Sequence, residues 1–122
     1  MLPYKLHTVG NVIVVEITGL GLMEGPELDL MAQRLQEELM RSKGKRMVLD
    51  CRRLKFMASV ALSVIVTLSH LADQHKGGFV VCGLQAQLIQ IFRISGIDRY
   101  IPICGTCEEA VAKLAGQADG TP

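Results

Sequence analysis

The sequence predicts a single α/β domain, and three observations lead to that class. First, short strand-like segments alternate with longer helix-like segments along most of the chain, which favours parallel strands joined by right-handed helical crossovers. Second, the 122 residues match the size of one domain, commonly about 100–150 residues. Third, hydrophobic residues make up 49% of the chain and charged residues 20%, a composition typical of globular proteins.

The first elements are predicted to be a β-hairpin and an amphipathic helix. The segments 4–9 and 12–19 are rich in β-branched residues, and Gly10 in the Gly-Asn pair between them tolerates the positive φ angle of a tight turn. After a glycine-punctuated loop, Pro26 fits the first turn of a helix that runs to about Ser42. Apolar residues recur along this helix at spacings of three and four: Leu28, Met31, Leu35 and Leu39.

A buried strand and an uncharged helix follow. Residues 47–49 form a short apolar run that ends at Asp50, and the absence of alternation predicts burial on both faces. The helix is predicted from Ser59 to His75. We expect its core stripe to be Val60, Ala61, Val64, Leu68, Leu71 and Ala72. A polar stripe is expected on the opposite side: Ser59, Ser63, Thr67 and His70.

The remaining elements continue the alternation. A strand is predicted at 79–82, a helix at 84–94 and a last strand at 100–103. Thr106 and Glu109 form a capping box, in which hydroxyl and carboxylate bond free backbone N–H groups, before a helix over 107–114. We expect the folded domain to span 1–115 and the small, polar residues 116–122 to form a flexible tail.

Charge and aromatic content exclude several classes of function. Thirteen Lys and Arg against 12 Asp and Glu leave a net charge of +1, so no nucleic-acid partner is expected. The longest uncharged run, 56–72, is shorter than the roughly 20 residues of a membrane span, so we expect no direct membrane insertion. Four cysteines without a secretory signal favour the cytoplasm and free thiols.

Cys104-Gly-Thr-Cys107 is the one motif with potential chemistry. Cys107 begins a predicted helix, where the dipole favours a thiolate, so a dithiol redox protein is an alternative. In a thioredoxin-type fold, however, the pair follows an early strand, and a zinc site needs two further ligands. Because no nucleophile, base or phosphate-binding loop is assembled, we expect a binding or regulatory module without catalytic residues, cofactor or metal.

Six segments, taken in order, carry a resemblance to a known family. They are Pro26-Glu-Leu28, Met47-Val-Leu-Asp50, Leu54-Lys-Phe-Met-Ala-Ser59, Phe79-Val-Val-Cys-Gly-Leu84, Ile91-Phe-Arg-Ile-Ser-Gly-Ile-Asp-Arg-Tyr-Ile-Pro102 and Glu108-Glu-Ala110. The ordered set resembles the STAS domain, the fold of bacterial anti-sigma factor antagonists and of the cytoplasmic tails of sulfate transporters. The resemblance covers about residues 4–115 and implies a central mixed sheet of four to five strands, with four helices packed mainly on one side.

The resemblance also implies a function and a partner. Antagonists of this family bind a kinase-like anti-sigma factor and so release a sigma factor. The alternative is a non-catalytic scaffold subunit of a stressosome-like assembly or of an ABC lipid-transport complex. Either function is compatible with a homodimer. In either case Asp50 is expected at the carboxyl end of an interior strand.

The family's switch loop reads Asp-Ser-Ser/Thr-Gly, and the partner kinase phosphorylates the second hydroxyl residue. Here the four positions are Ala58, Ser59, Val60 and Ala61, so the usual acceptor position lacks a hydroxyl. Ser59 is the remaining candidate for phosphorylation, through a one-residue shift, but it is expected to cap the helix instead. The resemblance places the partner-binding surface at Leu22, Met23, Glu24, Met57, Ala58, Ser59, Val60, Ala61 and Leu62.

Overall fold

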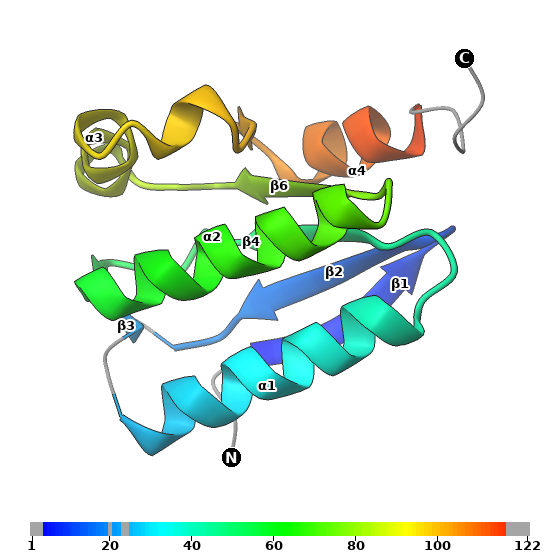
Figure 1. Ribbon diagram of the computed structural model, residues 1–122. Helices are drawn as coiled ribbons and strands as arrows, with labels where there is room; N and C mark the ends of the chain where they lie inside the picture. The colour runs from blue at the N-terminus through cyan, green and yellow to red at the C-terminus, as the bar shows by residue number, and fades with distance from the viewer. Residues whose placement is uncertain (1–3, 20, 23–24, 117–122) are drawn as a thin grey trace.

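The computed structural model describes residues 4–19, 21–22 and 25–116, and its architecture is α/β (Figure 1). The main sheet has five strands in the order β1-β2-β4-β6-β7. Their bounds are Tyr4–Val9 (β1), Val12–Ile17 (β2), Arg46–Asp50 (β4), Gly78–Cys82 (β6) and Ile103–Cys104 (β7). β1 pairs with β2 in the antiparallel sense, and the other neighbouring strands are parallel. The predicted mixed sheet is therefore confirmed, with Asp50 at the carboxyl end of an interior strand.

Alternating side chains of the sheet enter two cores. The helices are Pro26–Arg41 (α1), Ser59–Gln74 (α2), Ala86–Ile94 (α3) and Cys107–Ala115 (α4). The core under α1, α2 and α3 contains the strand residues Ile13, Val15, Ile17, Met47, Leu49, Phe79 and Val81. The core under α4 contains Val12, Val14, Val48, Val80 and Cys82. Three helices thus cover one face and one covers the other, which confirms the prediction of helices mainly on one side.

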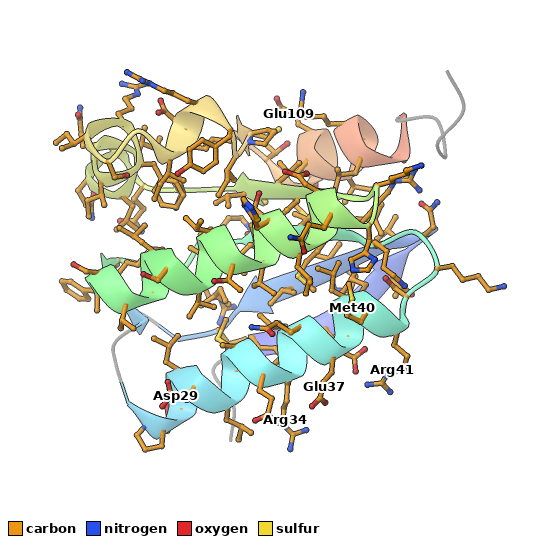
Figure 2. The ribbon with its side chains drawn as sticks, viewed as in Figure 1. Asp29, Arg34, Glu37, Met40, Arg41 and Glu109 are labelled. Atoms are coloured by element: carbon orange, nitrogen blue, oxygen red, sulfur yellow. The ribbon has the colours of Figure 1, made fainter. Side chains whose placement is uncertain are left out.

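The sequence pattern of α1 matches its environment. Leu28, Met31, Leu35 and Leu39 are buried, as predicted. Figure 2 shows Arg34, Glu37 and Arg41 on the side of α1 away from α2, and Met40 on the side that faces it. Among the described residues, no helix is both long enough and apolar enough to cross a membrane.

The predicted core stripe of α2 is wrong in part. The buried residues are Ala61, Ile65, Leu68, Ser69 and Ala72, whereas Val60 is 39% exposed. Val64 and Leu71 are only half-buried. The polar stripe is confirmed, because Ser59, Ser63, Thr67 and His70 are all exposed. The helix is apolar on most sides, so its periodicity fixes its rotation poorly and contacts with the sheet decide it.

The last strand was predicted too early. Instead of a strand at 100–103, the chain forms a 3-10 helix at Ile97–Arg99, and β7 follows at Ile103–Cys104. Gly96, with φ of 79°, supplies the left-handed residue that turns the chain out of α3. Ile97 and Ile101 then enter the core, at 5% and 0% exposure. Ile97 begins the 3-10 helix, and Ile101 follows it with its N–H bonded to the Ile97 carbonyl at 3.0 Å. The two apolar side chains therefore anchor this turn in the core and do not belong to a strand.

Candidate functional site

Two loops that are far apart in the sequence meet at the carboxyl end of the sheet. Gly21–Leu22 (β3), after β2, pairs in parallel with Phe56–Met57 (β5), which leads into α2. Gly21 lies opposite Phe56, and Leu22 lies opposite Met57. Figure 1 shows β3 beside the start of α2. We call β3, β5 and the first turn of α2, residues 21–22 and 56–62, the Ser59 surface.

The described residues of the predicted partner-binding surface differ in their exposure. Ser59 and Val60 are exposed, and Met57, Ala58 and Leu62 are half-buried. Ala61 is a correction, because its side chain is 1% exposed and belongs to the core under α2. The backbone of Leu22 is placed by its pairing with Met57. Met23 and Glu24 lie outside the described residues, as does the tail 117–122.

The prediction that Ser59 caps α2 is wrong. The N-cap residue is Ala58, with φ of −74° and ψ of 157°, and no side chain bonds the free N–H groups there. Ser59 is already the first helical residue. By contrast, Thr106 caps α4 as predicted, since its Oγ1 accepts a 3.1 Å hydrogen bond from the Glu109 N–H. The Thr106 hydroxyl also donates to Glu109 Oε1 at 3.1 Å, near the label in Figure 2.

The starts of α2 and α4 predict different losses of stability when a hydroxyl is removed. We expect Thr106→Ala to lower the free energy of unfolding by about 1 kcal/mol, the usual effect of losing an N-cap. Ser59→Ala should change it by less than about 0.5 kcal/mol, because this exposed hydroxyl caps nothing. Urea denaturation of both variants provides the comparison. An equal loss in both would mean that Ser59 caps α2 in solution.

An ion pair between the buried Asp50 and the exposed Arg52 lies in the chain that leads into the Ser59 surface. Asp50 is 2% exposed, and Arg52 Nε donates to its Oδ1 and Oδ2 at 3.1 and 3.0 Å. The Arg52 guanidinium also approaches Oδ2 at 2.9 Å, and the Arg52 backbone N–H donates to Oδ1 at 3.2 Å. The hydrogen bonds and charge of Asp50 raise the pKa of Arg52. Losing Arg52 would leave a buried carboxylate without its cation, which is costly.

The sequence analysis located Asp50 but missed the role of Arg52. The signal was present: a carboxylate that ends a buried strand needs a cation nearby, and Arg52 is two residues away. Both members of the pair line a cavity of about 160 Å³, together with Glu16, Ile17 and Arg53. The ion pair thus fixes Arg52 at the carboxyl end of β4, where the 52–55 loop begins.

Cys82 and Cys107 lie in an environment that disfavours the reactive thiolate form. Cys82 is fully buried beneath α4, and Cys107 packs against the same core. Burial, and then the charge of Asp50, raise the pKa of both thiols. A raised pKa lowers the thiolate fraction at neutral pH, which supports the interpretation of Cys107 as an ordinary first-turn thiol. No three His, Cys, Asp or Glu residues within the described ranges gather so that they could hold a metal ion.

Comparison with known proteins identifies the family. The model of the STAS domain matches residues 5–110. The chain belongs to the STAS domain family. BtrV of Bordetella bronchiseptica, a candidate anti-sigma factor antagonist, is 32% identical over 84 residues, which cover 66% of this chain and 72% of BtrV. The anti-sigma F factor antagonist of Paenibacillus polymyxa is 25% identical over 104 residues, which cover 85% of this chain and 87% of that protein.

A solved structure confirms the STAS fold. An anti-sigma-factor antagonist (STAS) domain protein from Planctomyces limnophilus superposes with a TM-score of 0.82 at 17% sequence identity. The match covers 93% of this chain and 98% of that one. At this identity the likeness concerns the fold, so the function of the present STAS domain depends on its own surface residues.

Proposed function

We propose that this STAS domain is a cytoplasmic anti-sigma factor antagonist that binds a kinase-like anti-sigma factor through the Ser59 surface, so that a sigma factor is released. The names of its relatives in Bordetella and Paenibacillus support the class of protein. The observation that carries the proposal is the β3–β5 pairing, which joins two separate loops beside α2. Such a composite surface suits the recognition of a folded partner rather than catalysis.

We further propose that the partner is bound constitutively. Val60, at the position where the family has its phosphoacceptor, has no hydroxyl, and its side chain is 39% exposed. Phosphorylation of such a residue would add about −1.5 to −2 charges and disrupt an apolar interface. Because Val60 cannot be modified in this way, binding is not switched off by the partner's kinase activity.

The experiment that tests this function is affinity capture with the purified chain as bait, followed by mass spectrometry. We expect a kinase-like anti-sigma factor to be captured, and Val60→Asp to weaken its binding by roughly tenfold or more, because a charge enters the apolar contact. Thr67→Asp, on the exposed polar stripe of the same helix, is the matched control and should bind normally.

Two results would contradict the proposal. Capture of a transporter ATPase or of other STAS subunits, without an anti-sigma factor, would favour the scaffold alternative. Equal binding by Val60→Asp and unmodified protein would move the interface away from the first turn of α2.

A further inference from the structure

The Ser59 surface presents two exposed apolar side chains, which we call its apolar centre. Phe56 is 58% exposed and Val60 is 39% exposed, and they come from β5 and from the first turn of α2. The Phe56 side chain lies over the backbone of Gly21: a Cβ built there would be 3.4 Å from Phe56 Cβ and 3.8 Å from Cδ2. The ring therefore has a fixed support on β3 while more than half of its surface faces solvent. A supported aromatic ring of this kind is a typical anchor of a protein interface.

Two cations immediately precede Phe56 in the chain. Arg53 and Lys55 are exposed, while Leu54 between them is fully buried and holds the loop on the core. Arg52 is committed to Asp50. In the part of the chain that the structure describes, neither Arg53 nor Lys55 is joined to a carboxylate. Arg53 lines the cavity that also contains Glu16 and Asp50, but among the described residues it is bonded to neither, so 52–55 carries an excess of cations in a chain whose net charge is only +1.

We infer that the Ser59 surface recognises a protein whose contact site has an apolar centre flanked by Asp or Glu residues on the side of Arg53 and Lys55. The inference rests on the proposed function for the identity of the partner, and it adds the chemistry of that partner. Complementary charges at the rim steer association and fix the orientation of the complex. Figure 2 shows Asp29 at the start of α1, in the helix that follows β3 in the chain.

The first test uses peptides and needs no identified partner. The probes are two hexapeptides with Leu-Phe at the centre, one with two glutamates at each end and one with two lysines at each end. We expect the acidic peptide to shift the backbone amide NMR signals of residues 53–60, and the shifts to shrink as salt is added. The basic peptide should give shifts several-fold smaller. An equal response to both, or a preference for the basic peptide, would overturn the inference.

The second test uses the captured anti-sigma factor. The double charge reversal Arg53→Glu/Lys55→Glu should weaken its binding by about tenfold or more, mainly through slower association. The matched control, Lys43→Glu/Lys113→Glu, makes the same change in net charge beyond the end of α1 and in α4, and should change binding less than about twofold. Circular dichroism of both variants should match that of the unmodified protein.

The outcomes separate this inference from the proposed function. Capture of an anti-sigma factor whose binding ignores the Arg53/Lys55 reversal would overturn the inference and leave the proposed function in place. Selective binding of the acidic peptide, together with capture of no anti-sigma factor, would support the inference and contradict the proposed function. Binding of duplex DNA at Arg53 and Lys55 in preference to the acidic peptide would also overturn it.

Discussion

Gly77→Ala is expected to lower the free energy of unfolding by about 3 kcal/mol or more. A Cβ on Gly77 would lie 1.8 Å from the carbonyl oxygen of Lys45 and 2.5 Å from its carbonyl carbon. These are backbone atoms, so no side-chain rotation relieves the overlap. The same carbonyl accepts the Gly78 N–H at 3.0 Å, and the residues around it join α1 to β4 and α2 to β6. The substitution must therefore separate the starts of two central strands.

Gly105→Ala is the matched control for Gly77→Ala. Its new Cβ would have one described neighbour within 4 Å, the flexible Glu109 Oε1 at 3.4 Å, and we expect a change below about 0.5 kcal/mol. Urea titration of both variants by circular dichroism provides the measurement. Similar midpoints for the two would contradict the close approach of Gly77 to Lys45. Any folded fraction of Gly77→Ala should still bind the partner, because this contact lies at the opposite end of α2 from Ser59.

The parts of the fold that were predicted correctly are those with a strong local pattern. The buried run 47–49 ending at Asp50, and the apolar spacing of α1 from Leu28 to Leu39, each specify an element without knowledge of the rest of the chain. The predictions of which side of α2 faces the core and of where the last strand lies were wrong, because both features depend on packing. The position of the sheet relative to each segment decides that Val60 is exposed and that Ile101 is buried. No local pattern in the sequence indicates it.

The site was predicted less completely than the fold. β3 and β5 have two residues each, too few for any periodicity, so their pairing could not be read from the sequence. The family resemblance did indicate that the two loops share a surface, although Ala61 faces the core and Met23 and Glu24 lie outside the described residues. Phe56 was missed as a surface anchor, because an aromatic residue is more often assigned to a core than to solvent.

Incubation with the captured kinase-like anti-sigma factor and ATP is expected to leave the unmodified chain without phosphate. Val60 offers no hydroxyl, and Ser59 lies one residue earlier on α2, about 100° around the helix from that position. A kinase must hold the acceptor oxygen to within about one bond length of its productive position beside the phosphoryl group. A hydroxyl displaced around the helix does not meet that requirement. Intact-mass measurement before and after incubation checks this result. One phosphate on Ser59, with loss of partner binding, would show that the switch has moved by one residue.

Val60→Ser supplies the missing hydroxyl and makes the expectation sharper. The variant should gain one phosphate under the same conditions and then lose most of its affinity for the partner, because a dianion replaces an exposed apolar side chain of the Ser59 surface. Before incubation it should bind within a few-fold of the unmodified chain, since serine removes only part of one exposed side chain. Val60→Ala is the matched control: it loses the same methyl groups, gains no hydroxyl and should remain unphosphorylated. If Val60→Ser also stays unmodified, the partner does not act as a kinase at this position, and constitutive binding would need a cause other than the missing hydroxyl.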